Sequence, residues 1–286
     1  MTNPEAPRIG GVIGGHEFEA GKWPWLVSMQ GKIPKYSLFG VPLAYTNIYC
    51  GASLINDRWI LTAAHCFPTD SYGSRALVPR YWHIRLGARK LRSTLKHRIQ
   101  GLLGHWLNIN DWKEWYVHGE KVFIYKDYDS EDFWRNDIAL VKLRDAVPVG
   151  SEIFPEIQSV TLPMRGDAAF PADGARCMMV GWGCTSKGGR VSDVAREVVL
   201  PKVPDNVCSS FWGVSTYSRL CAGYNLAHKG ICPGDSGGPL VCARGDKWVQ
   251  VGIASFTSVN APGNSPGGFT RVSAYVDWIK DTIRNN

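Results

Sequence analysis

The sequence lacks the features that mark several other protein classes. Its 286 residues contain no apolar run long enough to span a bilayer, and the opening stretch MTNPEAPRIG has no apolar core of a secretory signal. No internal repeat is present, which argues against a solenoid. No Asn-X-Ser/Thr sequon with a permitted middle residue occurs, so we expect no N-glycosylation.

The cysteines lack the spacing of a metal site. None of the eight forms a CxxC pair, and no histidine pair follows them at zinc-ligand spacing. An even number of cysteines spread through one domain favours disulfides, which persist in oxidising compartments. We therefore expect a secreted protein without a metal or other cofactor. Eight buried free thiols in a cytosolic protein are the alternative.

Acidic residues are missing between Asp70 and Asp111. This span holds eight basic residues, a number close to the net charge of +7: Arg75, Arg80, Arg85, Arg89, Lys90, Arg92, Lys96 and Arg98. A basic stretch over 75–98 would attract a polyanion or an acidic protein surface. The alternative is a solvated loop that keeps the protein soluble.

Helical periodicity is scarce. The clear case is the C-terminus, where Tyr275, Val276, Trp278, Ile279 and Ile283 predict one face of a helix over about 274–284. Elsewhere short apolar runs alternate with Gly, Pro, Asn and Ser, a pattern typical of sandwiches and barrels. These runs are 25–29, 59–64, 137–143, 177–182, 239–242 and 249–255. A stretch rich in Pro, Gly and Ser over about 146–163 could link two halves of the fold.

Three segments combine residues suited to nucleophilic catalysis. In GDSGGPL (234–240), glycines around Ser236 allow a sharp turn that directs N–H groups at one point. In LTAAHC (61–66), His65 ends an apolar strand, and imidazole is the natural general base near neutral pH. In NDIALVKL (136–143), Asp137 opens an apolar strand, where a buried carboxylate needs a hydrogen-bond partner such as an imidazole.

Together and in this order, TAAHC, DIAL and GDSGGP resemble the trypsin/chymotrypsin family. Further matches are VIGGHEFEAGKWPW (12–25), CGASLI (50–55), CMMVGWG (177–183) and CAG (221–223), so the resemblance extends from Val12 to the C-terminus. It implies an all-β fold of two six-stranded antiparallel β-barrels around a central cleft, with a C-terminal α-helix. The barrels would span about 28–145 and 164–273, within one protease domain over 12–286.

The resemblance also implies residue roles. His65, Asp137 and Ser236 would form the catalytic triad, and the N–H groups of Gly234 and Ser236 would form the oxyanion hole. Ser255 would support Asp137, and Ser255, Phe256 and Thr257 would pair with an extended substrate.

Most disulfides follow from the family pattern. Three pairs match it: Cys50–Cys66, Cys177–Cys242 and Cys208–Cys221. The usual partner of Cys232 falls at Ala261, so Cys184, the remaining cysteine, is predicted to pair with Cys232. Two free thiols are the alternative.

Members of the family are activated when a new N-terminus pairs with the aspartate before the nucleophile. Here these would be Val12 and Asp235, so 1–11 is predicted to be a leader and the full chain an inactive precursor. An activating protease would cut at Gly11–Val12, or at Arg8–Ile9 with trimming afterwards.

The pocket positions of the family predict the specificity. Gly230 stands where trypsin-like members carry an aspartate, Ile231 adds apolar bulk, and Thr257 and Gly267 take the wall positions. This set resembles elastase-like members and predicts cleavage after small or medium aliphatic residues. A preference for Phe, Leu or Met is the alternative, and a non-catalytic binding homologue is a third reading.

Three stretches are longer than usual in the family: about 30–49, 67–85 and 88–118. They could restrict which macromolecular substrates reach the cleft, or they could be insertions without a function on a surface that tolerates them. We expect a monomer that acts on proteins or peptides.

Overall fold

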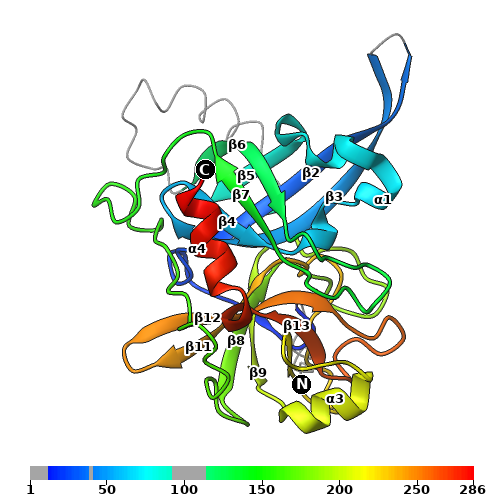
Figure 1. Cartoon of the computed structure of the whole chain (residues 1–286), viewed down its shortest axis with the longest axis vertical. Coiled ribbons are helices and arrows are strands. Elements are labelled where there is room, and N and C mark those ends of the chain that lie inside the picture. Colours follow the sequence, from blue (N-terminus) through cyan, green and yellow to red (C-terminus); the bar gives the residue numbers. More distant parts are fainter. Residues whose placement is uncertain (1–11, 39–40, 92–113) are drawn as a thin grey trace, which may run out of the picture.

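The computed structural model describes residues 12–38, 41–91 and 114–286. Within these ranges the chain forms two β-rich bodies, one above the other in Figure 1, and the helix α4 lies along their left side. The all-β prediction with a C-terminal helix is confirmed.

The N-terminal body is a closed barrel with the strand order β2-β3-β4-β7-β6-β5 among the described residues. Its strands are β2 (Leu26–Leu38), β3 (Val41–Asn56), β4 (Trp59–Thr62), β5 (Trp82–Leu86), β6 (Trp115–Ile124) and β7 (Ala139–Leu143). All neighbours pair antiparallel, for example Ile60 with Val141. The predicted runs 59–64 and 137–143 supply the central strands because nearly every residue in them is apolar and buried.

The C-terminal body is a curled sheet of the order β1-β9-β8-β11-β12-β13-β10 within the same described ranges. Its strands are β1 (His16–Glu17), β8 (Arg176–Gly181), β9 (Arg196–Pro201), β10 (Arg219–Ala222), β11 (Pro239–Arg244), β12 (Lys247–Phe256) and β13 (Gly267–Arg271). The expected six-stranded barrel thus has one more strand, β1. It docks beside β9, where buried Glu197 accepts hydrogen bonds from Lys22 and Trp23.

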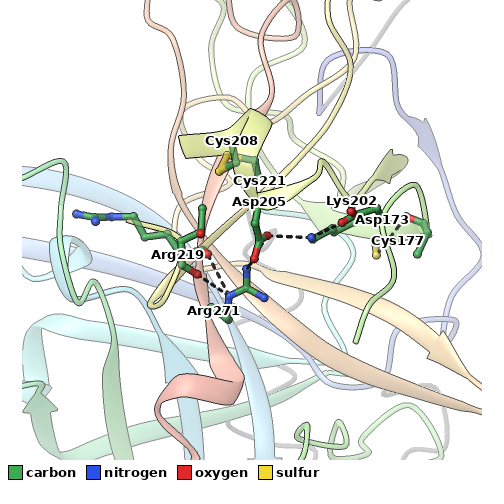
Figure 2. A network of polar contacts seen from close by, with 10 residues as sticks. Asp173, Cys177, Lys202, Asp205, Cys208, Arg219, Cys221 and Arg271 are labelled. Carbon is green, nitrogen blue, oxygen red and sulfur yellow. Dashed lines mark hydrogen bonds and ion pairs between the residues drawn. A yellow bond between two sulfur atoms is a disulfide. The ribbon is translucent and has the colours of Figure 1, made fainter. Parts of the chain in front are cut away.

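Strand β9, next to the two-residue edge strand β1, meets the opposite edge strand β10 at a short seam. Lys202, just after β9, forms an isolated bridge with Ala222 in β10, and the Val203 N–H donates to the Cys221 carbonyl at 2.8 Å. Beside the seam, buried Lys202 and Arg271 both contact the Asp205 carboxylate (Figure 2). The curled sheet is therefore closed by a few bonds and ion pairs instead of a regular strand pair.

Helices are short. They are α1 (Thr69–Tyr72), α3 (Asp205–Trp212), α4 (Val276–Arg284) and the 3₁₀ turns η1 (Ala64–Cys66), η2 (Gly73–Leu77), η3 (Pro79–Tyr81) and η4 (Val272–Ala274). The C-terminal helix α4 buries Val276 and Ile279, as its periodicity predicts. No helix of the described residues is long and apolar enough to cross a membrane.

Between β7 and β8 the chain holds no regular strand or helix, and the linker predicted over about 146–163 falls within this segment. The long stretch over 30–49 is the hairpin of β2 and β3, which projects at the upper right of Figure 1. The stretch over 67–85 holds α1, η2 and η3, whereas most of 88–118 lies outside the described residues.

Candidate active site

His65 is fixed by its neighbours in the first barrel. The fully buried strand β4 runs into η1, which carries His65, and Cys66 is joined to Cys50 of β3 by a disulfide. The His65 side chain keeps 19% of its surface exposed. The imidazole is therefore anchored from behind while part of its ring stays accessible.

Asp137, which is completely buried, holds His65 at two points. Its Oδ1 accepts a bond from the His65 N–H at 2.9 Å, and its Oδ2 lies 2.6 Å from His65 Nδ1. Burial alone would lower the pKa of His65, but the charge and hydrogen bond of Asp137 raise that pKa above its ordinary value of 6.5. With Nδ1 donating to the carboxylate, Nε2 is left with a lone pair that can accept a proton.

The second barrel also binds Asp137. Ser255 Oγ of β12 donates to Asp137 Oδ2 at 2.5 Å, and Thr270 Oγ1 of β13 donates to the Asp137 carbonyl at 2.7 Å. The Ser255 contact is the one expected from the sequence. Both barrels therefore hold this carboxylate.

Ser236 lies on a turn that is pressed against the first barrel. The Gly51 N–H of β3 donates to the Ser236 carbonyl at 2.8 Å. A Cβ on Gly237 would come within 2.2 Å of Thr62 Oγ1, just ahead of His65, so only glycine fits there. The Gly237 N–H donates to Ala254, the neighbour of Ser255. These contacts bring the Ser236 turn to the segments that carry His65 and Ser255.

The same turn has two backbone amides free for a ligand. The N–H groups of Asp235, Gly237 and Gly238 donate to carbonyls of the protein, whereas within the described residues those of Gly234 and Ser236 have no acceptor. Gly234 has a φ of +101°, and a Cβ there would lie 2.6 Å from a methyl carbon of Val191. The turn therefore requires glycine at this position and leaves available the two donors that the sequence assigns to an oxyanion hole.

Asp235 is buried behind this turn. Its oxygens accept the N–H groups of Gly183 at 2.7 Å and Cys232 at 3.0 Å, and no cationic side chain of the described residues pairs with it. Burial raises its pKa from 3.8 to about 7, although the two amide bonds act in the opposite direction. Val12 is fully buried nearby, where the following residue, Ile13, pairs with Gly230.

The predicted pocket residues come together around β13. The Ile231 side chain is buried and fills the space beside Gly267, where an added Cβ would lie 2.7 Å from Ile231 Cγ1. Gly230 lies against the backbone of Gly263. Thr257 follows β12 with its hydroxyl buried and, among the described groups, without a hydrogen-bond partner. None of these positions carries a charge.

Sequence reasoning missed an aromatic cluster beside the site. The ring of Trp134 lies 6.3 Å from that of His65 and stacks at 6.4 Å on Phe256. Phe133 and Trp212 also contact Phe256, at 5.9 and 5.2 Å. Phe256 was predicted to lie at the substrate strand. Two adjacent aromatic residues, Phe133 and Trp134, precede Asp137 by three to four positions, and this was the sequence signal that could have predicted the cluster.

All eight cysteines lie in the described ranges, and they form four disulfides. The pairs are Cys50–Cys66, Cys177–Cys242, Cys208–Cys221 and Cys184–Cys232. Cys184 and Cys232 have their Cα atoms 5.3 Å apart, and their bond ties the loop after β8 to the Ser236 segment. In the described part of the chain, no cluster of three or more His, Cys, Asp or Glu residues could hold a metal.

The basic stretch 75–98 does not act as one charged face in its described part. Arg85 is buried and pairs with Glu114, and Arg89 pairs with Glu17. Arg75, Arg80 and Lys90 are exposed. Arg92, Lys96 and Arg98 lie outside the described residues.

Comparison with known proteins agrees with this geometry. The family model described as trypsin matches residues 12–279. The chain is also 34% identical to chymotrypsin-like elastase family member 1 of Macaca fascicularis over 281 residues, which are 96% of this chain and 90% of that protein. The family match over most of the chain and the 34% identity lead to one conclusion: the chain belongs to the trypsin family and is a serine endopeptidase.

Proposed function

We propose that His65, Asp137 and Ser236 carry out peptide hydrolysis through an acyl-enzyme. The observation that supports this most directly is the buried Asp137 carboxylate, which binds both the Nδ1 and the backbone N–H of His65. Ser236 Oγ attacks the scissile carbonyl carbon while its proton passes to His65 Nε2. The carbonyl oxygen becomes an oxyanion that accepts the N–H groups of Gly234 and Ser236.

The second half of the reaction uses the same groups. The His65 imidazolium gives its proton to the leaving amine as the C–N bond breaks, which leaves the acyl group on Ser236. Water then attacks the ester with His65 as base, and the proton returns to Ser236 Oγ as the acid product leaves. Asp137 keeps the tautomer and stabilises the imidazolium throughout.

The main-chain groups of Ser255, Phe256 and Thr257 at the end of β12 would pair with an extended substrate. The exposed ring of Trp134 next to His65 and that of Phe133 beside Phe256 would then contact apolar side chains that precede the cleaved bond.

The pocket for the residue before the scissile bond would accept small or medium aliphatic side chains. Gly230 offers no counter-ion for Arg or Lys, the buried Ile231 side chain fills space beside Gly267, and β-branched Thr257 narrows one wall. The relative from Macaca fascicularis, which is named as an elastase family member, supports the same preference.

Hydrolysis of matched peptide anilides that end in Ala, Val, Phe or Arg tests the proposal, with enzyme that begins at Val12 and Ser236→Ala as the control. We expect Ala or Val to exceed Phe by about tenfold or more in kcat/KM, since one methylene in an apolar pocket is worth roughly 1–3 kcal/mol. Fastest cleavage after Phe would replace this preference with the chymotrypsin-like one. Fastest cleavage after Arg would refute the pocket assignment, and no cleavage at all would favour a binding homologue.

The proposal includes activation by cleavage. Residues 1–11 would be a leader ahead of a protease domain over 12–286, and the ammonium of Val12 would pair with Asp235. Two observations support this: Val12 is buried, and the buried Asp235 carboxylate has amide partners but no cationic partner among the described residues. An activating protease would cut at Gly11–Val12, or at Arg8–Ile9 before trimming.

Four disulfides fit an oxidising compartment, so we place the protein outside the cell. Exposed Arg75, Arg80 and Lys90 leave part of the basic stretch available for a polyanion or an acidic protein surface.

A further inference from the structure

The segment just before Asp137 has an unusual backbone. Phe133, Trp134 and Asn136 have φ angles of +42°, +49° and +57°. Residues with a side chain rarely adopt this left-handed region, at a cost of roughly 1–2 kcal/mol each. Three such residues among four persist only where surrounding contacts hold them. The contacts at the two ends of the segment are therefore informative.

The end next to Asp137 is held by hydrogen bonds to Asn136. Its Oδ1 accepts from the Tyr275 hydroxyl at 2.6 Å, and its Nδ2 donates to the Asp127 carbonyl at 2.6 Å. Tyr275 belongs to the second barrel's end of the chain, just before α4. This end is thus fixed without any charged side chain.

The other end is held by a buried arginine of the second barrel. Arg219 lies in β10, keeps only 5% of its side-chain surface exposed, and donates from Nη2 to the Asp132 carbonyl at 2.6 Å. The same Nη2 lies 3.5 Å from Asp132 Oδ1. No other described cation reaches the Asp132 carbonyl, which otherwise accepts only the N–H of Arg135.

The backbone of Arg219 is itself anchored. Its carbonyl accepts a bond from Arg271 Nε at 3.1 Å, and Arg271 is bound in turn to Asp205. In Figure 2 the Arg219 side chain leads away from the Asp205–Arg271 pair. The guanidinium is therefore extended toward Asp132 from a rigid base.

Between the two anchored ends lie Phe133 and Trp134, residues that are 45% and 39% exposed. Their other ring contacts are with His65, Trp212 and Phe256. Ring contacts alone fix neither the carbonyl of Asp132 nor the left-handed backbone that follows it. A shift of that carbonyl would move both rings relative to His65.

We propose that Arg219 is a positioning residue that sets how well the enzyme binds extended substrates. By holding the Asp132 carbonyl, it keeps Trp134 beside His65 and Phe133 beside Phe256, where both rings contact apolar side chains ahead of the cleaved bond. The inference rests on the proposed function, because it takes these rings to line the cleft. Arg219 itself touches neither the substrate nor the reacting atoms.

The test compares a long substrate with a short one. A tetrapeptide anilide with apolar residues ahead of Ala reaches the rings, whereas the nitrophenyl ester of acetyl-alanine does not. We expect Arg219→Met to lower kcat/KM on the tetrapeptide about tenfold, mainly through KM, while the ester rate stays within about twofold. The matched control is Arg135→Met, because Arg135 pairs with the same Asp132 but is 48% exposed and should change neither rate.

Other results would overturn the inference. Equal losses on both substrates would mean that Arg219 serves general stability, and no loss on the tetrapeptide would mean that the rings need no such support. If Arg219→Met does not fold, Arg219→Lys replaces it. This variant should also lose more kcat/KM on the tetrapeptide than on the ester, although by a smaller factor. Equal losses on the two substrates would contradict the inference. The ester also titrates active Ser236 in the unmodified enzyme. If the proposed function were wrong, no serine would be titrated, so this measurement distinguishes failure of the proposed function from the outcomes above.

Discussion

We predict that Asp235→Asn has opposite effects on stability in the full chain and in the proposed active form that begins at Val12. In the full chain the Asp235 carboxylate is buried with two amide partners and no cation from the described residues, and its pKa is raised from 3.8 to about 7. The unfolded chain ionises this group above about pH 4, whereas the folded chain keeps the proton until about pH 7. The folded state thus binds the proton more tightly, so its stability falls as pH rises through this window.

The size of the effect follows from the difference in pKa. At 1.36 kcal/mol per unit, the loss between pH 4 and pH 8 is about 4 kcal/mol. The substitution Asp235→Asn removes this dependence, because an amide side chain cannot ionise. The amide also cannot satisfy both N–H donors, which costs about 1–3 kcal/mol at every pH. Between pH 4 and pH 8, the free energy of unfolding of the full-length protein should therefore fall by about 4 kcal/mol relative to that of its Asp235→Asn variant.

The enzyme that begins at Val12 should behave in the opposite way. Its new ammonium would pair with the carboxylate, and loss of one partner of a buried pair costs about 3–5 kcal/mol. There Asp235→Asn should be strongly destabilising at pH 8. The proteins for both comparisons carry Ser236→Ala so that they cannot digest themselves.

Urea unfolding followed by tryptophan fluorescence at pH 4, 6 and 8 measures all four proteins. Parallel pH profiles for the two full-length proteins would refute the reasoning, because Asp235 would then be ionised in the folded full-length protein. A Val12 enzyme that is not destabilised by Asp235→Asn would refute the ion pair of the active form.

Three further predictions follow from the same structure. The acid limb of kcat/KM should have its midpoint above 6.5, because Asp137 raises the pKa of His65. Asp137→Asn should move that midpoint to lower pH and reduce turnover by roughly 10⁴-fold, and an unmoved midpoint would contradict the assignment. Thr257→Gly should raise the kcat/KM ratio of Phe over Ala anilides by roughly tenfold, and an unchanged ratio would show that Thr257 does not line the pocket. Asp205→Ala removes the carboxylate partner of buried Arg271 and one of the two carboxylate partners of buried Lys202 (Figure 2), and should cost about 3 kcal/mol in urea unfolding. Asp173→Ala, at an exposed partner of Lys202, should cost under about 1 kcal/mol, and equal losses would contradict this view of the network.

Local patterns predicted much of the fold. The apolar runs at 59–64, 137–143 and 239–242 became β4, β7 and β11, because residues buried on both faces of a strand must be apolar wherever the strand lies. The turn around Ser236 could be anticipated from its glycines, whose lack of Cβ is needed against Thr62 and Val191.

Features that depend on distant partners could not be predicted in this way. Strand β1 has two residues and no apolar pattern. It is held beside β9 because the Glu197 carboxylate binds the side chains of Lys22, Trp23 and His16, which are at least 174 positions earlier in the sequence. The left-handed segment before Asp137 likewise depends on Arg219, which is 87 positions away. Neither carries a local signal, since Phe and Trp do not favour positive φ.

Each barrel binds residues of the proposed catalytic triad that belong to the other barrel. Asp137 belongs to the first barrel but is bound by Ser255 and Thr270 of the second. Ser236 belongs to the second barrel, yet its carbonyl is bound by Gly51 of the first. Because these bonds cross the junction in both directions, direct contacts hold together the segments that carry His65 and Ser236. Residues 30–49 of the β2–β3 hairpin, which lie ahead of Gly51, can therefore vary without disturbing the proposed triad, and differences in substrate choice can arise there.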